Sequence, residues 1–245
     1  MSERVKIIAL RGASHEAPEN TVAAIKEAVK AGVDVVALDV QGSKDDEPVL
    51  IGDARVDRVT NGQGRVAHLT LKELQQLDAG SWFDPKFAGT KLATLEEGLK
   101  ALGKKTRAML LLPQMDAGGK LAANVLAALK TRGASDDLLV FTDSGTLKGL
   151  REKAPGAGCV LALDEKVDGW IHLEKARSLG LKTIRPHARQ VNAKLVRDAR
   201  ARELTVYVHF ADEADDLREL VELKVDGIVT GRPERLKEIL DGAKS

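Results

Sequence analysis

The sequence predicts an α/β protein of the (β/α)8 barrel class, with a hairpin arm and an inserted loop region at the C-terminal mouth of the barrel. Short apolar runs alternate with amphipathic helical segments from end to end. These runs are continuous in apolar character, as in parallel strands that are covered on both faces. Eight such units in 245 residues indicate a single barrel domain spanning 1–245, with a doubly wound open sheet as the structural alternative.

Each expected element follows from this alternation. The apolar runs predict strands at 5–10, 35–40, 108–112, 138–142, 159–163, 183–186, 205–210 and 227–230. The amphipathic segments predict helices at 20–31, 95–102, 120–131, 147–153, 173–179, 193–201, 212–223 and 234–240.

One further apolar run, 48–53, does not fit the alternation. Only 41–47 separate it from the second strand, which is too short for a helical crossover, so we expect an antiparallel hairpin arm. Residues 54–90 then form a long insertion rich in glycine and polar residues. Because barrel active sites lie at the carboxyl ends of the strands, this insertion is expected to shape the mouth of the pocket.

The composition excludes several classes of partner. The net charge is +1 and aromatic residues make up only 3% of the chain, so neither the field nor the stacking surfaces of a nucleic-acid-binding protein are expected. No apolar run approaches the roughly 18 residues needed to span a bilayer, and the start of the chain does not resemble a signal peptide. We expect a cytoplasmic protein with no nucleic-acid or membrane partner, and the oligomeric state stays open.

A series of spaced motifs gives a more specific indication. Residues 11–14 and 17–21 look like His-Arg-Gly followed by Pro-Glu-Asn-Thr, the opening motif of the glycerophosphodiester phosphodiesterase family. The chain continues to resemble that family in order at 38–40, 43–45, 57–58, 61–64, 77–83 and 225–230. The resemblance implies a TIM barrel that carries one divalent metal ion, two catalytic histidines and a phosphate-binding arginine, Arg11, at its mouth.

The chain departs from the family pattern at the positions that carry the chemistry. Leu10 stands in place of the first catalytic histidine and Gly52 in place of the second. Ala37 replaces the glutamate of a Glu-x-Asp metal pair. In the strand at 108–112, Leu112 replaces a metal-binding glutamate, and Gln114 beyond it replaces a lysine.

These departures predict that the family reaction is lost. Asp39 is the carboxylate that remains, and a hard divalent cation needs several oxygen ligands. Without the metal and both histidines, nothing assists attack on phosphorus or moves the protons. We therefore expect no metal, no cofactor and no competent metal-dependent phosphodiesterase.

The replacements at Leu10, Ala37, Gly52 and Leu112 share a direction, from bulky polar groups to apolar or small ones. Such a pocket suits a small-molecule ligand of aromatic or aliphatic character. Because the surrounding frame is intact, we favour the hypothesis of an engineered or designed barrel with a rebuilt pocket. A natural pseudoenzyme is the alternative.

Three residues are candidate catalytic groups for such a pocket. Asp39, with apolar neighbours, is expected to be poorly solvated and a stronger base when ionised. His209 ends a barrel strand, and an imidazole there would titrate near neutrality. Asp53 could orient a histidine. His15, His68 and His172 read as loop or surface residues.

The candidate binding residues surround the same mouth. Trp82 or Phe210 could stack on a flat substrate, Gln114 or Thr142 could donate to an oxyanion, and His187 could line the rim. Together with the candidate bases, they suggest proton abstraction from carbon, as in a Kemp-elimination-type lyase. The alternatives are a module that binds a phosphorylated or aromatic ligand through Arg11, a scaffold without a ligand, and a weak residual phosphodiesterase.

Overall fold

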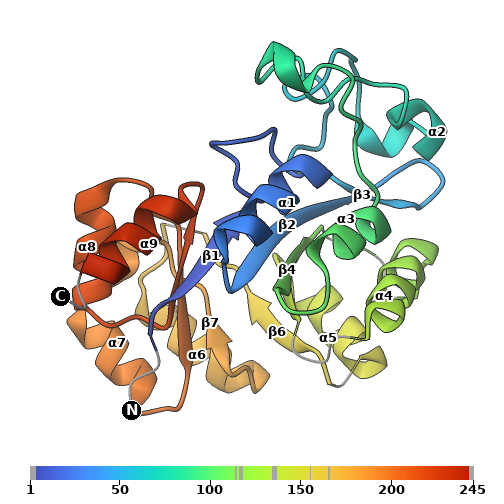
Figure 1. Cartoon of the computed structure of the whole chain (residues 1–245). Coiled ribbons are helices and arrows are strands. Elements are labelled where there is room, and N and C mark those ends of the chain that lie inside the picture. Colours follow the sequence, from blue (N-terminus) through green and yellow to red (C-terminus); the bar gives the residue numbers. More distant parts are fainter. Residues whose placement is uncertain are drawn as a thin grey trace.

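The computed structural model describes residues 4–113, 115, 118–133, 137–154, 156–164 and 166–242, and it confirms the expected barrel (Figure 1). The parallel strands follow the order β6-β5-β4-β2-β1-β9-β8-β7. Among the residues just given, the two ends of this path meet through a single parallel bridge, between Ala162 and Arg185. The ring of strands is therefore nearly closed, with one weakly paired seam between β6 and β7.

The expected strands and helices are all present, with boundaries that shift by a few residues. The strands of the ring are β1 (Lys6–Leu10), β2 (Val35–Gly42), β4 (Arg107–Leu112), β5 (Leu138–Phe141), β6 (Gly158–Leu161), β7 (Thr183–Ile184), β8 (Thr205–His209) and β9 (Gly227–Thr230). The helices are α1 (Val22–Ala31), α2 (Leu71–Leu74), α3 (Leu95–Leu102), α4 (Lys120–Arg132), α5 (Ser144–Lys153), α6 (Trp170–Leu179), α7 (Ala193–Arg200), α8 (Ala214–Glu222) and α9 (Pro233–Gly242).

Local sequence signals set the ends of several helices. Thr21 caps α1 by accepting a hydrogen bond from the backbone of Ala24, and Thr94 forms a capping box with Glu97 at the start of α3. Gly32 ends α1 in the left-handed conformation that glycine adopts at no steric cost. None of the helices in the described ranges combines the length and apolar character needed to cross a membrane.

The side chains of each strand alternate between two parts of the core. One cluster, the inner core, consists of strand residues alone, including Val35, Ala37 and Met109. The other cluster, the outer core, joins the strands to the helices and includes Leu38 of β2. Because side chains of a strand alternate, Asp39 faces the inside of the barrel together with Ala37.

This alternation corrects one prediction from the sequence. Leu112 belongs to the outer core under the helices, so the interpretation of Leu112 as a wall of the pocket is wrong. Its neighbour Leu111 packs against the inner core and lies beside Asp39 in the register of β2 and β4. A one-residue error in the placement of a strand moves each side chain to the opposite face.

The hairpin arm is also confirmed. Strand β3 (Pro48–Leu50) pairs antiparallel with β2, with Val40 opposite Leu50 and Gly42 opposite Pro48. The insertion that follows lies beyond one end of the barrel, where Figure 1 shows α2. It has a small apolar cluster of its own, which includes Val56 and Leu74.

Candidate functional site

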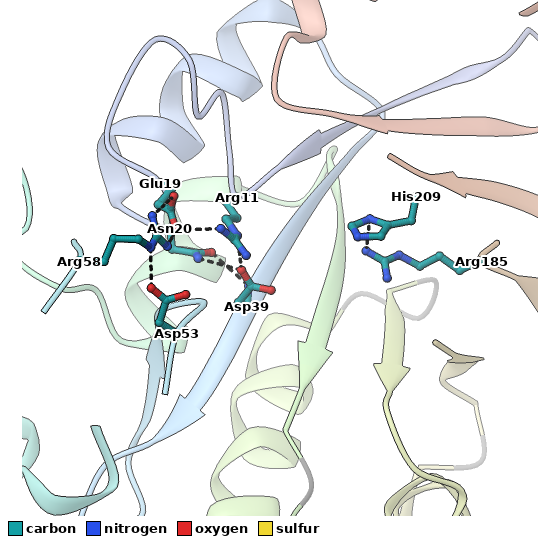
Figure 2. A network of polar contacts seen from close by, with 8 residues as sticks. All are labelled: Arg11, Glu19, Asn20, Asp39, Asp53, Arg58, Arg185 and His209. Atoms are coloured by element: carbon teal, nitrogen blue, oxygen red, sulfur yellow. Dashed lines mark hydrogen bonds and ion pairs between the residues drawn. The ribbon is translucent and has the colours of Figure 1, made fainter. Parts of the chain in front are cut away.

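A network of charged side chains lies at the mouth, where the parallel strands have their carboxyl ends (Figure 2). Arg11 follows β1, and its Nε donates to Asp39 Oδ2 at 2.5 Å. Its Nη1 donates to Glu19 Oε1 at 3.0 Å. Arg11 therefore joins two carboxylates. Asp39 is buried, as expected, but the expectation that its neighbours are apolar alone is wrong, because it is paired with a cation.

Asn20 holds Asp39 from the other side. Asn20 Nδ2 donates to Asp39 Oδ2 at 3.1 Å, and the backbone N–H of Asp39 donates to Asn20 Oδ1 at 3.1 Å. Both residues are buried. This reciprocal pair fixes the carboxylate at the end of β2 in one orientation.

The loop between β1 and α1 adopts an unusual backbone to bring these groups together. Arg11 and Asn20 have φ angles of 59° and 56°, in the left-handed region that residues other than glycine seldom occupy. Gly12, with φ of 86°, packs so closely that a β-carbon there would lie 2.6 Å from the backbone of Ala24. Backbone strain of this kind is concentrated at functional sites.

Arg58 of the insertion extends the network. Its guanidinium donates to both carboxylate oxygens of Glu19, at 2.6 and 3.0 Å, and its Nε donates to Asp53 Oδ2 at 2.5 Å. These two carboxylates raise the pKa of Arg58 above its usual value. Asp53, a candidate catalytic residue, contacts an arginine here and no histidine. The result is a chain of alternating charges from Asp39 to Asp53.

A second polar pair, Arg185 and His209, lies on the other side of the barrel interior. Arg185 follows β7, where Ile184 belongs to the outer core, so alternation points Arg185 inward. Arg185 is only 5% exposed. Its Nη2 lies 2.6 Å from His209 Nδ1. Because a guanidinium can only donate, Nδ1 accepts and the imidazole proton is on Nε2.

Burial sets the protonation state of this pair. Burial and the nearby positive charge of Arg185 lower the pKa of His209 to about 3. Burial lowers the pKa of Arg185 to about 10, against the opposing effect of the Asp39 charge. At neutral pH the guanidinium is therefore charged and the imidazole is neutral. The prediction that His209 titrates near neutrality is wrong, because the sequence did not reveal the buried cation beside it.

Three positions where the sequence departs from the family pattern lie close to Asp39. Ala37 is fully buried in the inner core, and Leu10 packs against the same cluster. A β-carbon on Gly52 would lie 2.9 Å from both Arg11 Nη2 and Asp39 Oδ2. The space that a side chain at position 52 would need is therefore taken by the ion pair.

The candidate binding residues fall into two groups. His187 and Phe210 surround His209, with ring centroids 6.2 Å and 5.3 Å from it. Trp82 lies in the insertion, where its indole donates to the carbonyl of Ala79. Across the described ranges, no hydrogen bond or ring contact joins Trp82 to the network or to His209.

Two further candidates and one histidine complete the comparison with the sequence predictions. Thr142 lies exposed just beyond β5, and Gln114 lies outside the described residues. His172 was expected at the surface, but it is buried in α6 and shares a hydrogen bond with the side chain of Gln190. The substrate-binding role of each candidate stays a prediction.

The described residues do not fit a divalent metal ion of the kind that the family pattern implies. Asp39 Oδ2 already accepts from Arg11 and Asn20, and Ala37 and Gly52 offer no side-chain ligand. Within the described part of the chain, no three His, Cys, Asp or Glu side chains come together in a way that could hold a metal ion.

Sequence reasoning missed Arg185 as a site residue. The available signal was a charged residue at the end of an apolar strand, directly before Pro186. Glu19, Asn20 and Arg58 were present in the motifs, but without a role. Only the structure shows that Asn20 holds Asp39, that Glu19 contacts Arg11, and that Arg58 joins Glu19 to Asp53.

The fold and the polar groups at its mouth define a (β/α)8 barrel of the type found in phosphodiesterases. The chain belongs to the glycerophosphoryl diester phosphodiesterase family, whose pattern matches residues 11–235. It is 32% identical to a glycerophosphodiester phosphodiesterase of Caldanaerobacter subterraneus over 236 residues, which cover 94% of this chain and 95% of that protein. A shorter match, 58% identical over 99 residues, covers 40% of this chain and 41% of YhdW of Bacillus subtilis, less than two thirds of its length.

Solved structures agree with this assignment. The crystal structure of glycerophosphodiester phosphodiesterase from Agrobacterium tumefaciens is 29% identical, with a TM-score of 0.83 over 96% of this chain and 99% of that one. A phosphodiesterase of Oleispira antarctica, solved in complex with the product sn-glycerol-3-phosphate, has a TM-score of 0.88 over 96% of each chain. At 24% sequence identity, this match shows a similarity in fold alone.

Proposed function

We propose that this protein binds a phosphorylated small molecule of the glycerophosphodiester type at the mouth of the barrel and does not hydrolyse it. The observation that carries this proposal is the ion pair between Arg11 and Asp39, at 2.5 Å. The carboxylate that the family pattern assigns to a metal ion is held here by a guanidinium and by Asn20.

The same geometry argues against hydrolysis. Attack on a phosphodiester needs a group that takes a proton and a group that gives one. His209, with a pKa of about 3, is a weak base at neutral pH. The carboxylate of Asp39 is already engaged, because its Oδ2 accepts from Arg11 and from Asn20.

The argument extends to the lyase function suggested by the sequence. Proton abstraction from carbon needs a base with a free lone pair facing the substrate. The Nδ1 lone pair of His209 is already used by Arg185, and one of the two carboxylate oxygens of Asp39, Oδ2, already accepts from Arg11 and Asn20. Binding is therefore the function that the geometry favours.

The class of ligand follows from charge and from family membership. The guanidinium groups of Arg11, Arg58 and Arg185 all lie at the mouth (Figure 2), and guanidinium groups match phosphate oxygens well. The relatives are named for glycerophosphodiesters, and one structure contains sn-glycerol-3-phosphate. A glycerol phosphate or its diester is the ligand that suits both facts.

The proposal can be tested by calorimetry and a hydrolysis assay on the same preparation. Glycerol 3-phosphate and glycerophosphocholine are titrated into the full chain, and release of glycerol 3-phosphate is followed with magnesium, calcium or EDTA. We expect heat of binding and no release above the rate without protein. Hydrolysis that depends on an added cation would disprove the non-hydrolytic part. No heat for either compound at millimolar concentration would disprove the binding part.

A further inference from the structure

We propose that the buried guanidinium of Arg185 supplies the positive charge that holds an oxyanion inside this barrel, in the role that a divalent cation would otherwise have. The proposal deepens the function proposed above and rests on it for the identity of the ligand. Its starting point is that Arg185 is 5% exposed and its Nε is buried without a hydrogen-bond partner.

Two other arginines of the mouth, Arg11 and Arg58, are already neutralised. Arg11 contacts the carboxylates of Asp39 and Glu19, and Arg58 contacts those of Glu19 and Asp53. Among the described residues, no carboxylate lies within ion-pairing distance of Arg185. Of these three arginines, Arg185 is therefore the one whose positive charge is left for a ligand.

An uncompensated buried cation opposes folding. Removing a guanidinium from water is strongly unfavourable unless a counter-ion or several hydrogen bonds offset it. Within the described part of the chain, the side chain of Arg185 bonds the acceptor nitrogen of His209 and forms no ion pair, and the charge of Asp39 acts on it from farther away. Polar groups that are buried without partners are uncommon, and a functional role is one explanation for them.

The neighbours of Arg185 favour an anion as its partner. His209 accepts from Nη2 and fixes the orientation of the guanidinium. The Nε2–H of the same ring is a further donor. Asp39 lies near enough to influence Arg185 electrostatically, but it is held by Arg11. A tetrahedral oxyanion such as phosphate, free or as an ester, matches this set of donors.

The test compares matched variants in the presence of EDTA. Inorganic phosphate and glycerol 3-phosphate are titrated into wild type, Arg185→Met, Arg185→Lys and Arg189→Met. Arg189 is exposed three residues beyond Pro186, so Arg189→Met makes the same change of charge outside the barrel. We expect Arg185→Met to weaken binding at least 10-fold, as is typical when a charged hydrogen-bond partner is removed. Arg185→Lys should fall between wild type and Arg185→Met, and Arg189→Met should bind within about 2-fold of wild type.

A second readout separates loss of the ligand site from loss of the fold. If Arg185 serves the ligand, Arg185→Met removes a buried charge and should unfold at the same or a higher urea concentration than wild type. Weaker binding with lower stability would mean a structural role and would overturn the proposal. Unchanged affinity in Arg185→Met, or binding that appears only with added magnesium or calcium, would also overturn it.

The outcomes also distinguish this proposal from the function proposed above. Phosphate binding that depends on Arg185, without binding of glycerol 3-phosphate or its diester, would support the anion site and reject the glycerophosphodiester ligand. Binding of glycerol 3-phosphate that is equal in wild type and Arg185→Met would support the ligand and reject the role of Arg185.

Discussion

Gly52 is the residue that most directly controls the charged network at the mouth. A β-carbon there would lie 2.9 Å from both Arg11 and Asp39, so a histidine cannot be introduced without displacing the ion pair. We expect Gly52→His to lower the free energy of unfolding by about 1–3 kcal/mol, as overpacking does elsewhere. Urea denaturation measures this change.

The control is Gly156→His, at a position where a β-carbon would meet no atom within 4 Å. It should change stability by no more than about 0.5 kcal/mol, as is usual at the surface. Equal stability of Gly52→His and wild type would mean that Arg11 can leave Asp39 without loss.

His209 predicts a specific dependence of stability on pH. Its pKa is lowered from 6.5 to about 3 in the folded protein, so between these values the unfolded chain binds a proton that the native state excludes. Stability therefore falls as the pH drops below about 6.5, by up to about 1.4 kcal/mol per pH unit from this group. Between pH 7 and pH 5 the contribution is about 2 kcal/mol.

The matched variant is His209→Asn, whose side-chain oxygen can accept from Arg185 but does not titrate. Urea denaturation at pH 5 and pH 7 should show a smaller loss of stability at pH 5 for this variant than for wild type. Parallel losses in the two proteins would show that the imidazole is not held neutral by the fold.

For individual residues, the sequence predicted where the site lies but not the contacts that its side chains make. The family motifs placed Asp39, Arg11 and Gly52 at one mouth, and they do lie together. The motifs could not reveal that Arg11 turns onto Asp39, because this depends on the left-handed backbone of the loop and on the space at Gly52. Arg185 was overlooked because its burial is visible only once the strands are closed into a ring.

Among the helices and strands, α4 is connected to its neighbours by a buried ion pair. Arg132, at the end of α4, donates to Asp137 at 2.7 Å and to the carbonyls of Gly103 and Thr106 at 2.7 and 2.6 Å. Its side chain is 4% exposed, as is that of Asp137. The arginine thus links α4 to β5 and to the segment that enters β4.

We expect Arg132→Met to lower the free energy of unfolding by about 3–5 kcal/mol, because it leaves the buried Asp137 without its cation. Lys130→Met, on the exposed side of the same helix, is the control and should have little effect. Urea denaturation compares the two variants. A loss below 1 kcal/mol for Arg132→Met would mean that water can replace the guanidinium.

At the element scale, periodicity was sufficient to predict each strand and helix of the barrel and the hairpin arm. It did not reveal which side chains of β4 point into the barrel, because the run from Met109 to Leu112 is apolar at each position. Such a run carries no alternation, so nothing in it distinguishes inward Leu111 from outward Leu112. An amphipathic strand would have shown the difference.

For the whole molecule, the arrangement of charges predicts that divalent cations do not change the stability of the native state. A cation that bound the native state with a dissociation constant of about 0.1 mM would, at 10 mM, stabilise it by about 2.7 kcal/mol. Since the described residues hold Asp39 by ion pairing and offer no cluster of metal ligands, we expect no such stabilisation. Thermal unfolding with magnesium, calcium or EDTA should give the same midpoint, and a rise with either cation would contradict this arrangement.

The seam between β6 and β7 gives the position of Arg185 a wider consequence. In the part of the chain that the structure describes, the ring of strands closes there through one bridge, and Arg185 is one of its two residues, opposite Ala162. An anion bound to this guanidinium would stabilise the weakly paired junction of β6 and β7. Amide hydrogen exchange near Ala162 and Arg185 should then slow when phosphate is added. This one measurement would report both the binding of the anion at the mouth and the stability of the ring of strands.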